Sequence, residues 1–123
     1  MIPTNIQLQA AFRSFASIRG WHDPHAVTLT MKQGQQIDGG RGPAFVALTP
    51  AMASTNMTHF LNRLNKSVFG NAAERFGKRV ASIPVLEGGN GDRLHYHLVL
   101  DCPRTDLHDG YAELISELWQ KTE

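Results

Sequence analysis

The sequence predicts an α+β domain in which helices pack on one face of an antiparallel sheet. Two β-type runs, at 79–86 and 94–101, flank the glycine-rich segment 88–92, which is the pattern of a hairpin. An earlier run at 26–31 is β-branched and alternates polar with apolar residues. Other segments space their apolar residues as helices do. The expected sheet therefore has three strands.

The first 24 residues are expected to form a helical extension of this single domain, which covers residues 1–123. Apolar residues recur at helical spacing between Gln7 and Ile18, and Gly20 supplies a stop. In the strand that follows, alternation places the apolar residues on one face and Thr28 and Thr30 on the other.

The middle of the chain is expected to hold a loop and a long helix. Residues 34–43 contain four glycines and a proline, which predicts a mobile or functional loop. After Pro50 an apolar stripe indicates a helix that Ser54 or Thr55 caps and Gly70 ends. A short basic helix at 72–76 and a last helix at 109–120 complete the expected order.

Composition is that of an ordinary soluble domain, with 41% apolar and 19% charged residues. No apolar stretch approaches the roughly 20 residues that span a bilayer, and the N-terminus lacks the pattern of a secretory signal. We therefore expect no membrane association. The single cysteine, Cys102, excludes an internal disulfide and favours a reducing compartment, the cytoplasm.

Charge is unevenly distributed along the chain. Residues 1–86 hold nine Lys and Arg against three Asp and Glu, whereas residues 87–123 hold three against eight. A polyanion should prefer the first part and reach the second through a bridging metal ion.

The strongest chemical signal is Glu87 followed after seven residues by His95-Tyr96-His97. A His-x-His on a strand puts both imidazoles on the same face. If the two flanking strands form a hairpin, Glu87 returns beside this pair. Two imidazoles and a carboxylate make a mixed site for a divalent ion with open positions for water or substrate. The alternative is a set of polar residues on a solvated strand face.

These residues resemble the motifs of HUH (His-hydrophobe-His) replication initiators, the rolling-circle Rep endonucleases. The segment Val27-Thr28-Leu29-Thr30 resembles their first motif and His95-Tyr96-His97 their second, while Glu87 has the spacing of their third metal ligand. The resemblance implies a ferredoxin-like core, Mg²⁺ or Mn²⁺ on Glu87, His95 and His97, and single-stranded DNA as substrate. It further implies a tyrosine that attacks a phosphodiester, joins the 5′ phosphate and frees a 3′ hydroxyl.

The chain departs from this family at the third motif, a Tyr-x-x-Lys helix that follows one further strand. We therefore expect a fold that is incomplete at the C-terminus, a member without its nucleophile, or a chain that borrows one. Tyr111 is the candidate nucleophile, but Leu114 stands where the lysine is expected. Packing in the core is the other interpretation of Tyr111.

Several residues are candidates for contact with nucleic acid. The threonines on the first strand would lie near the metal, although β propensity alone explains them. The basic residues would meet phosphates, or else form a solvated face. The candidates are Thr28, Thr30, Arg41, Arg63, Lys66, Arg75, Lys78 and Arg79.

The resemblance thus implies a metal-dependent domain that nicks and transfers single-stranded DNA, as Rep proteins do, with cleavage impaired in the chain as it stands. One alternative is a non-catalytic module that binds single-stranded nucleic acid with the same fold. Another is a small metal-dependent hydrolase whose loop at 34–43 covers a substrate. The sequence leaves the oligomeric state open.

Overall fold

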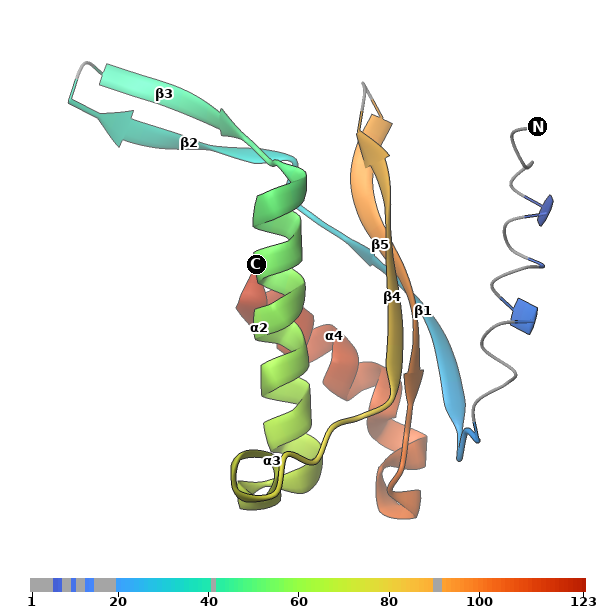
Figure 1. Cartoon of the computed structure of the whole chain (residues 1–123). Coiled ribbons are helices and arrows are strands. Elements are labelled where there is room, and N and C mark those ends of the chain that lie inside the picture. Colours follow the sequence, from blue (N-terminus) through green and yellow to red (C-terminus); the bar gives the residue numbers. More distant parts are fainter. Residues whose placement is uncertain (1–5, 8–9, 11–12, 15–19, 41, 90–91) are drawn as a thin grey trace.

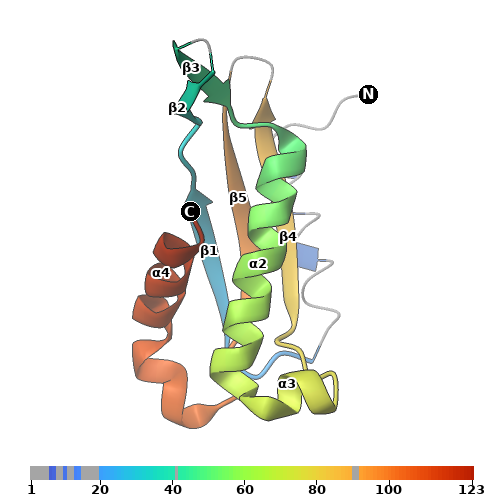
Figure 2. The same ribbon diagram turned by 90° about the vertical axis from the view of Figure 1, so that its left-hand side faces the viewer.

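A three-stranded antiparallel sheet in the order β1–β5–β4 forms the centre of the computed structural model, which describes residues 6, 7, 10, 13, 14, 20–40, 42–89 and 92–123. The strands are β1 (Pro24–Thr30), β4 (Ser82–Gly89) and β5 (Asp92–Asp101). Two helices, α2 (Pro50–Phe69) and α4 (Tyr111–Thr122), lie across one face of it (Figures 1 and 2). The α+β class and the antiparallel sheet are confirmed, and the arrangement is consistent with a ferredoxin-like fold.

The core lies between β5 and the two helices. Every second residue of β5 from Leu94 to Leu100 is buried, whereas the residues between them are half-exposed. The buried side chains of α2 and α4 are apolar or aromatic except for Asn65, and the Phe60 and Trp119 rings meet edge to face at 5.5 Å. Because strand side chains alternate, burying the leucines turns His95 and His97 to the opposite face.

The two outer strands of the sheet are held differently. On β1, the indole Nε1 of Trp119 donates a hydrogen bond to the Thr30 carbonyl at 2.7 Å, which ties α4 to this edge. On the other edge, β4 contains Pro84, whose side chain is exposed. Proline lacks a backbone N–H and is accepted in edge strands.

The segment expected to be a loop at 34–43 is instead part of a hairpin, so that prediction is wrong. Strand β2 (Gly34–Gly39) pairs with β3 (Gly42–Ala47), and the hairpin projects from the sheet (Figure 1). The glycines of this segment are compatible with the hairpin. At Gly34 a Cβ would lie 2.4 Å from the Phe45 ring, so glycine leaves room for this aromatic side chain.

The N-cap of helix α2 lies five or six residues before the two expected caps. Thr49 is the N-cap and its hydroxyl accepts from the Met52 amide, so the prediction of Ser54 or Thr55 as cap is wrong. Pro50 fits the first helical position because its missing N–H would have no partner there. Gly70 ends the helix at φ 59°, as expected. The helix spans 20 residues, and its buried positions run from Ala53 to Val68.

The remaining elements fall near their predicted positions. Helix α3 (Asn71–Arg75) follows α2 directly, and β4 starts three residues later than expected. A 3₁₀ helix, η1 (Thr105–Gly110), precedes α4. The apolar residues that predict the N-terminal helix, from Leu8 to Ala16, lie outside the described residues. No helix in the described part of the chain is long and apolar enough to cross a membrane.

Gln33 joins the β2–β3 hairpin to the central sheet. Its side-chain amide accepts from the Leu94 amide at 2.8 Å and donates to the Leu94 carbonyl at 2.9 Å. Its own carbonyl accepts from the Leu48 amide at 2.7 Å. The Gln33 side chain thus continues the pairing of β5 after β1 has ended at Thr30.

An irregularity in the β4–β5 pairing follows the position of Glu87. Glu87 pairs with His95, but Gly89 pairs with Asp92, so β5 contributes an extra residue. Gly88 has φ +100°, and a Cβ there would lie 2.1 Å from the Arg93 carbonyl oxygen. Only glycine tolerates both the left-handed conformation and this close backbone approach.

We expect Gly88→Ala to lower the free energy of unfolding by about 2 kcal/mol or more, because it adds strain and a backbone clash. Urea unfolding followed by circular dichroism measures the change. Gly110→Ala is the matched control, since φ is −110° there and a Cβ meets nothing within 4 Å. Equal stability of the two variants would contradict the role assigned to Gly88.

Candidate metal centre

Two rows of side chains cross the face of the sheet that α2 and α4 leave open. In one row, Thr30 of β1 pairs with His95, which pairs with Glu87 of β4. In the next row, Thr28 pairs with His97, which pairs with Val85. Paired residues in an antiparallel sheet point to the same side. The register therefore brings the three expected ligands together with both threonines.

The functional atoms of Glu87, His95 and His97 form a nearly equilateral triangle. The Glu87 Oε2 lies 3.3 Å from His95 Nε2 and 3.2 Å from His97 Nε2, and the two Nε2 atoms are 3.1 Å apart. The side chains are 50%, 30% and 45% exposed, in the order Glu87, His95, His97. The cluster is thus open to solvent and to a ligand from that side.

The contact made by Nδ1 of His95 indicates which ring nitrogen carries the proton. His95 Nδ1 lies 3.1 Å from the Arg93 carbonyl oxygen, which can only accept a hydrogen bond. In the neutral ring Nδ1 therefore carries the proton, and Nε2 presents a lone pair toward Glu87 Oε2, itself an acceptor. Such a contact is favourable only with a cation or a shared proton between the atoms.

His97 has a matching partner on the neighbouring strand. Its Nδ1 lies 3.1 Å from the Thr28 hydroxyl oxygen. When this hydroxyl accepts from Nδ1–H, the Nε2 lone pair of His97 is directed at the centre of the cluster. Acceptors behind ligating histidines orient the rings in this way and raise their basicity.

The donor set fits a metal ion. With ligand bonds of about 2.1 Å, neighbouring donors are separated by about 3.0 Å in octahedral and about 3.4 Å in tetrahedral geometry. The three measured separations lie between these values. Three donors on one side leave the other coordination positions for water or substrate, as in sites with two histidines and one carboxylate. Among the described residues, these three form the group able to hold a metal ion.

Neither of the two tyrosines of the chain lies at this cluster. Tyr96 points into the core from the opposite face of β5. Tyr111 is fully buried, and its hydroxyl donates to the Asp101 carbonyl at 2.8 Å. Burial raises the pKa of Tyr111 further above its usual range, which disfavours the phenolate that would attack a phosphate. The structure gives Tyr111 the contacts of a core residue.

The basic residues expected to contact nucleic acid do not lie at the cluster. Arg63 and Lys66 belong to α2 and Arg75 to α3, which is on the helical side of the sheet (Figure 2). Lys78 and Arg79 precede β4, at the end of this strand remote from Glu87 (Figure 1). Arg41 lies outside the described residues. The contact of these residues with nucleic acid stays a prediction.

Comparisons with protein-family models, with curated proteins and with solved structures found no match to this chain. The likeness to HUH initiators therefore depends on the residues of the motifs and on their placement in this fold.

We expect Thr28→Val to weaken Mn²⁺ binding about 10- to 100-fold, because it removes the acceptor that orients His97. Thr28→Ser keeps a hydroxyl and should bind nearly as the parent does. Thr30→Val is the matched control, since Thr30 occupies the same face and strand without a hydrogen bond to His95. Isothermal titration calorimetry measures the affinities, and equal losses for Thr28→Val and Thr30→Val would contradict the assignment.

Tyr111→Phe should lower stability by about 1–2 kcal/mol, because the buried Asp101 carbonyl loses its hydrogen bond. Affinity for Mn²⁺ should not change. Thermal unfolding and calorimetry on the same samples separate these two effects. A variant with full stability but impaired DNA cleavage would instead identify Tyr111 as a catalytic residue.

Proposed function

We propose that this chain is a metal-dependent domain for nicking and transferring single-stranded DNA, of the replication-initiator type, with Mg²⁺ or Mn²⁺ on Glu87, His95 and His97. One observation carries the proposal: the three donors converge on the solvent-exposed face of the sheet, each histidine having a partner on its Nδ1. Neither α2 nor α4 lies on this face (Figure 1), and the three side chains are 30–50% exposed, which leaves them accessible to a phosphodiester.

A bound divalent ion would polarise the scissile phosphate and offset the charge that develops on it. The residues of the chain supply the positioning. Arg93 and Thr28 fix the two imidazoles through their Nδ1 atoms, and the sheet register holds Glu87 opposite His95. A rigid strand pair is better suited than a loop to hold such a constellation.

The attacking group has to come from elsewhere than Tyr96 or Tyr111, because both lie on the helical side of β5. In the proposed reaction a tyrosine oxygen bonds to the phosphorus while the bond to the 3′ oxygen breaks. The chain as given should therefore bind metal and single-stranded DNA but cleave poorly.

The alternative function is a binding module without chemistry, and a specific observation favours it. The projecting β2–β3 hairpin carries Phe45, which is 64% exposed and available to stack on a base. For such a module metal would be dispensable, and affinity would fall steeply with salt as counterions are released. The small-molecule hydrolase is less well supported, because residues 34–43 belong to a hairpin that projects from the sheet.

The test combines the chain with fluorescent single-stranded oligonucleotides, in Mn²⁺ or in EDTA. We expect Mn²⁺ to strengthen binding and His95→Ala with His97→Ala to abolish the metal effect. His59→Ala, which removes an exposed imidazole of α2, should leave binding unchanged. Anisotropy reports binding, and a denaturing gel reports cleavage and covalent adducts.

Equal binding in Mn²⁺ and EDTA would support the non-catalytic module instead. A covalent adduct that Tyr111→Phe removes would overturn the exclusion of Tyr111 as nucleophile. No binding of single-stranded DNA under either condition would refute both forms of the proposal.

A further inference from the structure

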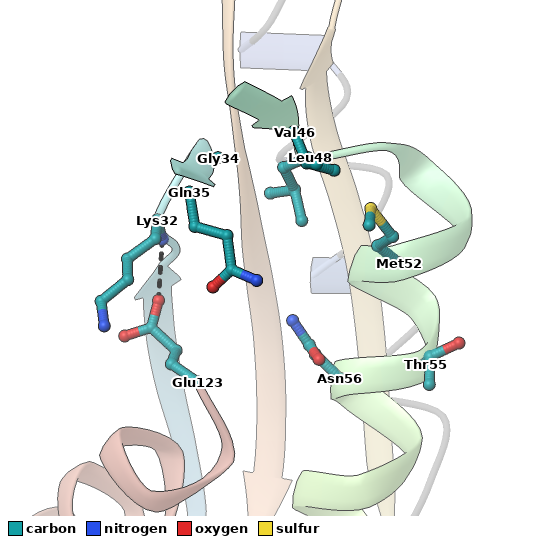
Figure 3. Close-up of a pocket in the computed structure, with 9 residues that line it drawn as sticks. All are labelled: Lys32, Gly34, Gln35, Val46, Leu48, Met52, Thr55, Asn56 and Glu123. Atoms are coloured by element: carbon teal, nitrogen blue, oxygen red, sulfur yellow. Dashed lines mark hydrogen bonds between the residues drawn. The ribbon is translucent and has the colours of Figure 1, made fainter. Parts of the chain in front are cut away.

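A cavity of about 330 Å³ opens beside the base of the β2–β3 hairpin, on the helical side of the sheet. Its walls come from three separate parts of the chain: the segment after β1 with the hairpin, the first turns of α2, and the C-terminal residue (Figure 3). This volume is at the lower end of the range for small-molecule sites, about 300–1,000 Å³. The metal cluster does not use any of the lining residues.

Two side-chain amides dominate the polar lining. Gln35 and Asn56 direct their amides toward the open space from opposite walls (Figure 3). In the described part of the chain, neither amide has a hydrogen-bond partner. Each offers a donor pair and an acceptor to a ligand.

The other walls are apolar or already satisfied. Val46, Leu48 and Met52 supply apolar surface. The Thr55 hydroxyl donates to the Ala51 carbonyl within α2 at 3.1 Å and so is engaged. This combination of apolar walls and free amides suits a heteroaromatic ring with hydrogen-bonding edges.

One cationic and one anionic side chain, Lys32 and Glu123, stand at one wall of this cavity. The backbone amide of Lys32 donates to Glu123 Oε1 at 2.8 Å, which fixes the Lys32 main chain at the wall. Its ammonium group forms no ion pair with any described residue, and the side chain extends away from the two amides (Figure 3).

The cavity and the metal cluster lie at the same end of the sheet. Lys32 follows Thr30 by two residues, and Thr30 pairs with His95 of the cluster. Gln33, between the two sites, is bonded to Leu94, the neighbour of His95. Because the two sites lie on opposite faces of the sheet, a bound single strand would have to pass around the end of β1, beyond Thr30, to reach both.

We propose that this cavity binds one nucleobase of the single strand, with adenine preferred. This inference rests on the proposed binding of single-stranded DNA and names a subsite for it. Adenine is favoured because a carboxamide pairs with its N6 and N7 through two hydrogen bonds.

The test compares oligo(dA) with oligo(dT) on the whole chain in Mn²⁺. Gln35→Ala combined with Asn56→Ala should weaken oligo(dA) binding about tenfold or more and leave oligo(dT) nearly unchanged. Thr55→Val is the matched control, because it alters the same wall without removing a free hydrogen-bonding group. Equal losses for both oligonucleotides, or no loss, would overturn the base site while metal-dependent binding by the parent upholds the proposed function.

A second measurement does not depend on the metal centre. In the His95→Ala, His97→Ala variant, dAMP should shift the side-chain amide NMR resonances of Gln35 and Asn56. Deoxyribose 5-phosphate, which lacks the base, should shift neither. Equal shifts with both ligands, or none with dAMP, would refute recognition of a base in this cavity.

Discussion

The alternation of β5 is the constraint on which the rest of the structure depends. Leu94, Leu98 and Leu100 are drawn under α2 and α4 by the hydrophobic effect, which is worth about 1.5–3 kcal/mol for each fully buried leucine. A slip of one residue would expose all of them. The same burial therefore holds His95 and His97 on the open face, so core packing and ligand placement are a single requirement.

Much of the site could be predicted from local sequence. The two-residue period of β5 fixes the face of the histidines, and the glycine-rich turn brings Glu87 back to them across a short hairpin. Contacts between distant segments were not accessible in this way. The Thr28–His97 hydrogen bond joins residues 69 positions apart, and Gln33 reaches Leu94 over 61. No local periodicity encodes such pairs.

The errors in the fold prediction also have physical causes. Glycines mark both loops and hairpins, and the alternation of β2 and β3 is weak because Gly34 and Ala47 carry little side chain. At α2, serine and threonine inside the helix resemble caps, whereas Thr49 followed by Pro50 is the stronger start signal. The burial of Tyr111 could be predicted more easily. The apolar stripe around this residue indicated a position in the core, and its hydroxyl is hydrogen-bonded there.

Pro84 and Trp119 also bear on how the sheet meets other chains. An exposed strand edge is a template for another strand, and proteins usually block it. Here Pro84 removes a donor from the outer edge of β4, and the Trp119 indole occupies the Thr30 carbonyl on β1. A strand added to either side would have to forgo a hydrogen bond or displace the indole. Both edges of the sheet are thus protected against pairing with a strand of another molecule.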